Sequence, residues 1–388
     1  MLRLQVYDFF ITRRCNLKCG FCYVKDKEQG KSSDEVERNI RTFKLLVENY
    51  RKNIPSDVPK QYRRLELELY GGEPTLAWDS VEAIVALAKE VKDIAVVFKI
   101  VSNMVEMDEI KIKFCNDNRI DIRPSVDGCK KAMDAHRIRP DGSSVADIVY
   151  KNAKFLLNSV APYKVCRSSI SPETCDYMFE SVKFLADLGF LGISQTIVSG
   201  VEWNLEKLEI VRQQVALISE WWVEEMKKGR HIEIFNLTVL LHGIWTDRYS
   251  QRPCTSGLVC GAVDLDGSIY PCHRFCNKST PSEYKMGTIY GGITNTDLID
   301  KLSRFDWVKY RREHCVSCIA IKSCRGVCLH DSMLNGKEPY TPTETYCSVT
   351  KMYMEQALRV HEMLKDNSTY LSAYKPRILE GSTNQRKI

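Results

Sequence analysis

Three cysteines near the start of the chain have a spacing that suits metal ligation. Cys15, Cys19 and Cys22 are separated by three residues and then by two. Thiolates at this spacing can wrap one corner of a cubane iron–sulfur cluster, and because such a cluster usually takes four cysteines, three of them leave one iron open. A metal centre keeps an open position when it must bind a reactant. A zinc site completed by a distant cysteine, or three unrelated core thiols, are the alternatives.

Eight further cysteines are closely spaced in the last third of the chain. Eight is the number that fully ligates two four-iron clusters, and two zinc knuckles are the alternative. They are Cys254, Cys260, Cys272, Cys315, Cys318, Cys324, Cys328 and Cys347. The remaining five, Cys115, Cys129, Cys166, Cys175 and Cys276, are expected to be buried or incidental thiols. Cys276 could compete as a ligand, because it follows Cys272 by four residues.

Strand-like and helix-like patterns alternate over the first two thirds of the chain. The expected strands are Leu4–Thr12, Leu65–Tyr70, Val96–Val101, Ile120–Val126, Lys164–Ile170 and Gly192–Val198. The expected helices are about Asp34–Tyr50, Ser80–Lys92, Met107–Asn116, Val145–Asn158, Cys175–Leu188 and Leu205–Lys228. Parallel strands need helical crossovers, so this alternation predicts an α/β fold with a parallel sheet. Six units are fewer than the eight of a closed barrel, which predicts a partial (βα)₆ barrel of the TIM type.

The composition and periodicity of the sequence change after about Asn236. Helical periodicity fades there, and Gly, Pro and Cys become dense before a final helix near Tyr346–Leu364. Little regular structure with many cysteines predicts a small domain held together by metal. We therefore expect a barrel over residues 1–235, a cysteine-rich cluster-binding domain over 236–365, and a flexible basic tail over 366–388.

Composition narrows the compartment and the class of protein. The chain has 388 residues, 16 cysteines and a formal net charge of +6. It contains no apolar run long enough to span a membrane and no signal-peptide layout at its N-terminus. We therefore expect a soluble cytoplasmic protein with no membrane partner, in which the cysteines bind metal rather than form disulfides. The modest charge surplus does not favour a nucleic-acid partner.

The first cysteine motif resembles the signature of the radical S-adenosylmethionine (SAM) enzymes. That signature is C-x3-C-x2-C with an aromatic residue before the third cysteine, a position that Phe21 fills. Gly71-Gly72-Glu73-Pro74, at the end of the second strand, resembles the GGEP element of the family. The two glycines would let the backbone approach a ligand closely, and Glu73 would accept hydrogen bonds from the amino group of SAM.

Polar residues at the ends of the next two strands resemble family positions near the ribose and carboxylate of SAM. They are Ser102 and Asn103 after the third strand and Ser125 after the fourth. Each is also an ordinary polar strand end. Arg137 or Arg139 would reach the methionyl carboxylate in a bidentate pair, and the spacing leaves open which of the two does so.

The resemblance implies a mechanism and its cofactors. The open iron chelates SAM, and an electron from the reduced cluster cleaves SAM to methionine and a 5′-deoxyadenosyl radical that abstracts hydrogen from the substrate. The protein orients these groups and excludes water. An electron donor such as flavodoxin or ferredoxin is implied as a partner.

The later cysteines resemble the SPASM extension of radical SAM enzymes, which binds two auxiliary clusters. By position, Cys254, Cys260, Cys272 and Cys328 would hold the first auxiliary cluster. Cys315, Cys318, Cys324 and Cys347 would hold the second. The resemblance thus implies three [4Fe-4S] clusters in total.

The same extension marks enzymes that act mostly on peptides or proteins. Anaerobic sulfatase-maturing enzymes, which oxidise Cys or Ser to formylglycine, use an Asp as base directly after the third cysteine of the extension. Here that residue is His273, in a Pro-Cys-His-Arg-Phe string that looks more like maturases of ribosomally made peptides. His273 could act as the base or serve as a donor to cluster sulfur. We therefore expect a maturase that installs carbon–carbon or thioether crosslinks, with sulfatase maturation as the alternative.

Two further expectations concern partners and class. Only fourteen residues precede Cys15, so a leader peptide would bind the barrel, the extension or a separate leader-binding protein. A zinc-rich nucleic-acid-binding protein is the alternative from a different class, but it does not explain the α/β repeat with Gly-Gly-Glu-Pro after the second strand.

Overall fold

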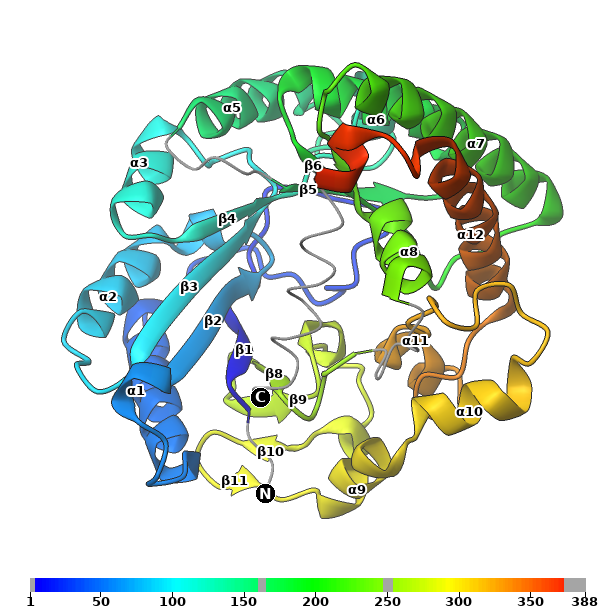
Figure 1. Ribbon diagram of the computed structural model, residues 1–388. Helices are drawn as coiled ribbons and strands as arrows, with labels where there is room; N and C mark the ends of the chain where they lie inside the picture. Colours follow the sequence, from blue (N-terminus) through cyan, green and yellow to red (C-terminus); the bar gives the residue numbers. More distant parts are fainter. Residues whose placement is uncertain (1–3, 160–164, 247–253, 373–388) are drawn as a thin grey trace. The chain divides into compact units, whose positions relative to one another are not determined.

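A computed structural model describes residues 4–159, 165–246 and 254–372 (Figure 1). The chain divides into two compact units, each built from segments far apart in the sequence. Unit 1 comprises Met1–Ser125, His136–Ala161 and Thr255–Phe305. Unit 2 comprises Val126–Ala135, Pro162–Cys254 and Asp306–Ile388. The predicted boundary after residue 235 is therefore not a point at which the chain passes from one unit to the other.

Unit 1 contains four parallel strands, each followed by a helix. The strands are β1 (Val6–Thr12), β2 (Arg64–Gly71), β3 (Ala95–Ser102) and β4 (Asp121–Pro124), paired in that order. The helices are α1 (Glu35–Asn53), α2 (Trp78–Ala88), α3 (Glu109–Asp117) and α5 (Ala146–Asn158). In β2, Leu65, Leu67 and Leu69 are fully buried, whereas the alternating glutamates are half-buried. This period of two directs one face of the sheet to an apolar core and leaves polar side chains on the other.

A hairpin from much later in the chain extends the same sheet. β8 (Cys260–Val263) pairs parallel to β1 on the side away from β2, with Asp8 opposite Ala262. β9 (Ser268–Tyr270), β10 (Gly287–Thr288) and β11 (Gly292–Ile293) follow in antiparallel order, and α9 (Thr296–Arg304) comes next. Residues expected in a separate cysteine-rich domain therefore belong to the sheet that begins the chain (Figure 1).

Unit 2 contains a smaller parallel sheet. Its strands are β5 (Val165–Ile170), β6 (Gly192–Ile197) and β7 (Glu233–Ile234). Its helices are α4 (Lys130–Asp134), α6 (Met178–Leu188), α7 (Leu205–Lys227), α8 (Phe235–Thr246), α10 (Trp307–His314), α11 (Leu329–Leu334) and α12 (Glu344–Leu364). The long helix α12 packs along α7 and α8.

The predicted alternation of six strands with helices is confirmed, and so is the final helix. The expectation of little regular structure after Asn236 is wrong, because α8 to α11 lie there. The sequence of α8, Phe-Asn-Leu-Thr-Val-Leu-Leu, is apolar nearly all round. It lacks the one-sided stripe that reveals an amphipathic helix, which is why its periodicity could not be read.

The predicted flexible tail is only partly described. Residues 366–372 are ordered within unit 2: Tyr370 is fully buried, and its hydroxyl accepts a hydrogen bond from Trp245 Nε1 at 2.9 Å. The rest of the predicted tail, 373–388, lies outside the described residues. Within the described ranges, no helix is both long and apolar enough to cross a membrane.

Candidate functional site

The three cysteines of the first motif follow the carboxyl end of β1. All three cysteines are half-buried, and the loop is held by hydrogen bonds from Cys22 N to the Cys19 carbonyl, at 3.2 Å, and from Leu17 N to Cys15 Sγ, at 3.4 Å. Burial raises the pKa of Cys15 to about 11, and the Lys27 ammonium opposes that shift. Metal ligation requires the thiolate, so binding of a cluster here would release a proton.

The Gly71–Gly72 turn is packed against this loop. Gly71 has a φ of +146°, and a Cβ on it would lie 2.0 Å from the carbonyl oxygen of Thr12. A Cβ on Gly72 would lie 2.2 Å from the carbonyl oxygen of Arg14. The glycines were expected to let the backbone approach a ligand. In the structure the close neighbour is the backbone that leads into Cys15, so any side chain here would displace the cysteine loop.

Glu73 is buried and accepts hydrogen bonds from three neighbouring residues. Its Oε2 accepts from Asn103 N at 2.7 Å, and its Oε1 accepts from Ser102 Oγ at 3.0 Å. Thr75 donates to Oε1 as well, through its hydroxyl at 2.8 Å and its backbone N–H at 3.2 Å. Burial raises the pKa of Glu73, and these donors oppose the rise. Oε2 accepts from Asn103 N and can accept a further hydrogen bond, so a role for Glu73 with an amino group of SAM fits its bonding capacity.

Glu73 thereby joins the ends of two strands. It also caps the short 3-10 turn Pro74–Ala77, in which Pro74 is the first residue. Ser102 is 1% exposed, and its carbonyl accepts from Ser125 N at 2.9 Å. The carboxyl ends of β2, β3 and β4 are therefore held together, and the predicted contacts of Ser102, Asn103 and Ser125 with SAM stay predictions.

An orphaned donor lies beside the first cysteine. Asn103 Nδ2 donates to Asn16 Oδ1 at 2.8 Å and lies 4.0 Å from Cys15 Sγ. Asn16 Nδ2 is buried and has no hydrogen-bond partner among the described residues. A buried amide that lacks an acceptor carries a free-energy cost, which a ligand acceptor would remove. This donor and the half-buried cysteines fit a cluster and SAM at this place.

The structure separates the two candidate arginines. Arg137 is 7% exposed, and its guanidinium lies over the ring of Phe21, 5.4 Å from the centroid. The Phe21 ring also meets the His136 ring edge-on, at 5.0 Å. Arg139 instead donates to the Ser144 carbonyl at 3.1 Å, within its own turn. Arg137 is thus the arginine that contacts the cysteine loop.

His273 contacts three residues of the sheet and the cysteine loop. Its Nδ1 lies 2.7 Å from Asp8 Oδ2, and its backbone N–H donates to the same oxygen at 3.1 Å. The imidazole stacks on the Tyr70 ring, with centroids 4.4 Å apart and an interplanar angle of 11°. The ring of Tyr23, the residue after Cys22, lies 5.2 Å away. Sequence reasoning missed Asp8, for which the one available signal was an acidic residue inside an otherwise apolar strand.

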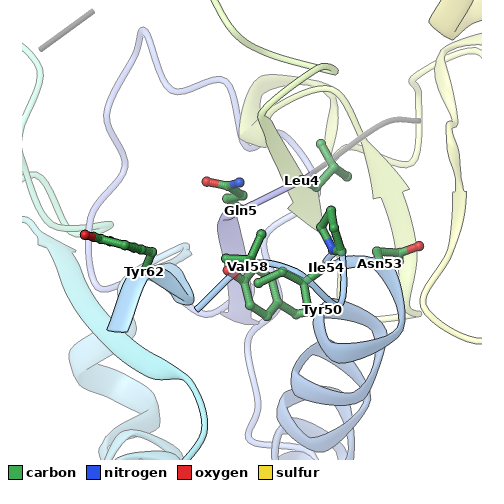
Figure 2. A pocket seen from close by; sticks show the side chains of 8 residues that line it. Leu4, Gln5, Tyr50, Asn53, Ile54, Val58 and Tyr62 are labelled. Carbon is green, nitrogen blue, oxygen red and sulfur yellow. The ribbon is translucent and has the colours of Figure 1, made fainter. Parts of the chain in front are cut away.

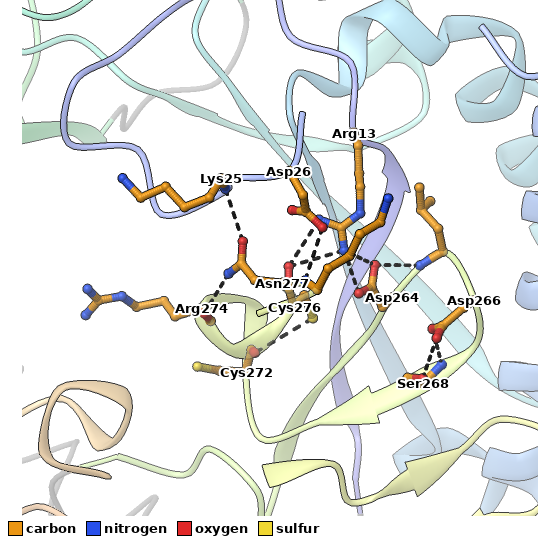
Figure 3. A network of polar contacts seen from close by, with 12 residues as sticks. Arg13, Lys25, Asp26, Asp264, Asp266, Ser268, Cys272, Arg274, Cys276 and Asn277 are labelled. Atoms are coloured by element: carbon orange, nitrogen blue, oxygen red, sulfur yellow. Dashed lines mark hydrogen bonds and ion pairs between the residues drawn. The ribbon is translucent and has the colours of Figure 1, made fainter. Parts of the chain in front are cut away.

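A buried arginine links the first cysteine loop to the segment around Cys276 (Figure 3). Arg13 Nη2 lies 2.6 Å from both carboxylate oxygens of Asp264, and Nη1 lies 2.6 Å from Asp26 Oδ1. The same guanidinium donates to the Cys276 carbonyl at 3.2 Å. Asn277 adds a bond from Lys25 N to its Oδ1, at 3.1 Å. Residues after Cys22 and residues after Cys272 are therefore fixed to one another.

Cys276 itself is a core residue. Its side chain is fully buried in an apolar cluster with Phe10, Val24 and Tyr70, and burial raises the pKa of its thiol well above the ordinary value. The other four spare cysteines, Cys115, Cys129, Cys166 and Cys175, are buried as well. The expectation of buried thiols holds for all five.

Four of the later cysteines lie close together within unit 2. The pKa of Cys324 is raised to about 11, mainly by burial and in addition by the neighbouring Cys347 and Cys318 thiols. The pKa of Cys347 is raised by burial and by Cys315 and Cys318. These four thiols, Cys315, Cys318, Cys324 and Cys347, are the set predicted for the second auxiliary cluster.

The set predicted for the first auxiliary cluster is divided between the units. Cys260 and Cys272 belong to unit 1, and Cys254 and Cys328 belong to unit 2. This ligand set stays a prediction. Among the described residues, no three His, Cys, Asp or Glu side chains converge on a point that a single metal ion would occupy. Cluster ligands bind different irons, so convergence of that kind is not required of them.

Two of the pockets formed by the described residues lie away from the cysteine loop. One of about 40 Å³ is lined by Leu4, Gln5, Tyr50 and neighbours, before the start of β1 and so at the opposite end of the strand from the cysteines (Figure 2). It is far smaller than a cofactor site requires. The other, of about 420 Å³, lies in unit 2 beyond the end of β5 and is lined by Pro172, Glu173, Glu202, Asn204 and Lys207.

Comparisons with known proteins agree with the resemblance to radical SAM enzymes. Residues 9–143 match the radical SAM superfamily. A cysteine-type anaerobic sulfatase-maturating enzyme of Clostridium novyi is 23% identical over 366 residues, which cover 88% of this chain and 92% of the relative.

Two solved structures share the fold. Native anSMEcpe with bound AdoMet and Cp18Cys peptide aligns with a TM-score of 0.72 and 20% identity over 93% of this chain and 99% of that one. Streptococcus suis SuiB bound to the precursor peptide SuiA aligns with a TM-score of 0.53 and 17% identity over 89% and 76%.

Proposed function

We infer that this radical SAM enzyme, whose radical SAM domain spans residues 9–143, forms a carbon–carbon or thioether crosslink in a ribosomally synthesised peptide. The observation that carries the inference is the contact between His273 and Tyr23, whose rings lie 5.2 Å apart. One residue directly follows Cys22 and the other directly follows Cys272. A group suited to act on the substrate therefore neighbours the loop on which the radical would arise.

The first cysteine loop would bind the catalytic cluster. Cys15, Cys19 and Cys22 would ligate it, and when bound, the cluster and SAM supply an organic radical that removes a hydrogen atom from the substrate. Arg137 would pair with the carboxylate of SAM, and Glu73 would accept from its amino group. Asn103 and Asn16 would donate to ligand acceptors, while Ser102 and Ser125 would hold the strand ends in place.

Two auxiliary clusters complete the proposal. The gathering of Cys315, Cys318, Cys324 and Cys347 within unit 2 supports the second of them. Reduction of the catalytic cluster, the one bound by Cys15, Cys19 and Cys22, would need an electron donor such as flavodoxin or ferredoxin. A separate protein could present the leader peptide. The zinc-rich nucleic-acid-binding alternative is set aside, because the chain is a radical SAM enzyme.

A peptide substrate is supported by the relatives. Both solved structures contain a bound peptide, Cp18Cys in one and the precursor SuiA in the other. His273 stands where the resemblance to sulfatase-maturing enzymes would require Asp, which favours the crosslink over formylglycine. His273 Nε2, the nitrogen that does not face Asp8, would contact the substrate.

Formylglycine formation is the second candidate, and two observations favour it. The similarity to the Clostridium novyi enzyme covers 92% of that protein. In addition, Asp8 places a carboxylate beside His273, where those enzymes would have their aspartate.

An anaerobic assay tests these proposals. The reconstituted full-length enzyme is given SAM and dithionite with either a candidate precursor peptide, taken from a short reading frame found next to its gene, or the Cp18Cys peptide. We expect 5′-deoxyadenosine together with a precursor peptide lighter by two hydrogen atoms that does not react with an aldehyde-specific hydrazide. A hydrazide-reactive Cp18Cys product would favour formylglycine. Formation of neither product would contradict a peptide-modifying function.

A further inference from the structure

No sequence motif predicts a role for Asp8 in the site. We propose that Asp8 is a positioning residue for His273, which it holds with Nε2 directed toward the substrate. This inference rests on the function proposed above and names the residue that orients its substrate-contacting group.

A single carboxylate oxygen fixes both the backbone and the ring of His273. Asp8 Oδ2 lies 3.1 Å from the backbone nitrogen and 2.7 Å from Nδ1. An ionised carboxylate can only accept, so the hydrogen bond places a proton on Nδ1, and in the neutral imidazole Nε2 then keeps its lone pair. Two contacts to one oxygen also define the ring's direction along its hydrogen-bond axis.

Aromatic neighbours restrict the remaining freedom of the ring. The near-parallel stack on Tyr70, at 4.4 Å and 11°, defines the plane of the imidazole, and Tyr23 lies against it at 5.2 Å and 47°. Asp8 and Tyr70 lie on adjacent parallel strands, β1 and β2, where Asp8 pairs with Glu68 and Phe10 pairs with Tyr70. A constellation built on paired strands keeps its geometry better than one built on loops.

The His273 side chain is more exposed to solvent than the Asp8 side chain. The Asp8 side chain is 13% exposed and that of His273 is 25% exposed. The carboxylate is therefore largely covered while part of the imidazole remains open. This arrangement corresponds to a covered orienting acid behind a histidine that can meet a substrate.

A purely structural role makes different predictions. If Asp8 only attached the short turn His273–Phe275 to β1, its loss would lower stability and all activities in proportion, whatever residue stood at 273. If Asp8 acts through the imidazole, its loss has no further effect once the imidazole is gone. Double-mutant cycles separate the two cases, because only coupled residues show non-additive effects.

The test uses the anaerobically reconstituted full-length enzyme, and the probe is whichever peptide of the assay above, the candidate precursor or Cp18Cys, the wild-type enzyme modifies. The variants are D8N, D8E, H273N and D8N/H273N, with D79N as a control at an exposed aspartate of α2 that pairs with Lys31. Two quantities are measured: modified peptide formed per 5′-deoxyadenosine, and iron bound per chain. Iron content shows whether the neighbouring Cys272 still ligates.

We expect D8N to lower the yield of modified peptide per 5′-deoxyadenosine about 10–100-fold with wild-type iron content, as is typical when an acid that orients a functional histidine is lost. D8E should recover part of this loss, D79N should match wild type, and D8N/H273N should be no worse than H273N. A full additive loss in the double variant, or a D8N yield equal to wild type, would overturn the role of Asp8.

Two controls keep the outcomes distinct. If D8N does not fold, D8E takes its place in the cycle, since it keeps the charge and displaces the carboxylate by one methylene. Wild-type yield of modified peptide per 5′-deoxyadenosine from D8E would then refute the positioning role. If the wild-type enzyme cleaves SAM yet modifies no peptide, the proposed function fails and the inference fails with it. A defect seen only in the variants bears on Asp8 alone.

Discussion

Arg13 and Asp264 form a forked ion pair across 251 positions of the sequence, with Arg13 Nη2 2.6 Å from each carboxylate oxygen. Both side chains are nearly covered, with exposures of 4% and 10%. Burial raises the pKa of Asp264, and the Arg13 guanidinium opposes that rise. The pair joins the residue that precedes the first cysteine loop to the turn between β8 and β9, so it holds together the two segments that carry the proposed site.

Loss of this arginine should destabilise the protein strongly. We expect Arg13→Met to lower the free energy of unfolding by about 3 kcal/mol, because removal of one partner leaves the other charge buried without compensation. Denaturant midpoints of the cluster-loaded protein measure the change. Arg51→Met, at an exposed pair with Asp93, is the matched control and should cost less than about 1 kcal/mol. Equal losses in both variants would contradict the structural role of Arg13.

The first three cysteines should be required for SAM cleavage alone. Replacement of Cys15, Cys19 and Cys22 with Ala should abolish 5′-deoxyadenosine and reduce bound iron by about four per chain, from about twelve. Chromatography of the reaction products and iron analysis measure both effects. Continued accumulation of 5′-deoxyadenosine in this variant would show that the motif does not bind the catalytic cluster.

The four gathered thiols of unit 2 should bind a separate cluster. Replacement of Cys318 and Cys347 with Ala should remove about four irons per chain and leave the other clusters bound. Cys115 and Cys166, which are fully buried spare thiols, provide the control pair. Their replacement with Ala should leave iron content unchanged. Zinc in place of iron in anaerobically isolated wild-type protein would refute the cluster assignment for this set.

Glu66 should give the sheet a defined sensitivity to acid. Its carboxylate pairs with Lys99, on the neighbouring strand β3, and with Arg64. Burial raises the pKa of Glu66, but these cations outweigh it and hold the pKa below its usual 4.5. Because the folded-state pKa is depressed, the stabilisation is present above pH 4.5 and is lost as the pH falls through the folded value.

The variant Glu66→Gln measures that contribution. We expect it to lower the free energy of unfolding by about 1 kcal/mol at pH 7, a value reduced by solvent screening of a half-buried pair. The difference from wild type should stay constant down to about pH 5 and narrow below the ordinary carboxyl pKa. Unfolding midpoints recorded over this range are the measurement. A difference that grows toward acid pH would mean that the sign of the shift is wrong.

Local sequence patterns predicted the positions of most strands and helices. Strand and helix positions follow from hydrophobic periodicities of two and 3.6 residues, which any short window contains, so β1 to β6 and their helices are found close to the predicted residues. The same holds for the cysteine motif and for Glu73, because each belongs to a short motif at the end of a strand. Helix α8 was missed for the converse reason, since an almost uniformly apolar helix leaves no periodic signal.

Long-range pairings were not predictable in this way. The sequence by itself determined the α/β alternation, the cysteine spacings and the strand ends that carry Ser102, Asn103 and Ser125. The tertiary structure alone decided that β8 pairs with β1, that Arg137 rather than Arg139 contacts Phe21, and that Asp8 meets His273 265 residues later. Such contacts depend on which strands become neighbours. The backbone groups that join two strands are the same whatever the side chains, so the side-chain pattern of one strand does not say which other strand it will pair with.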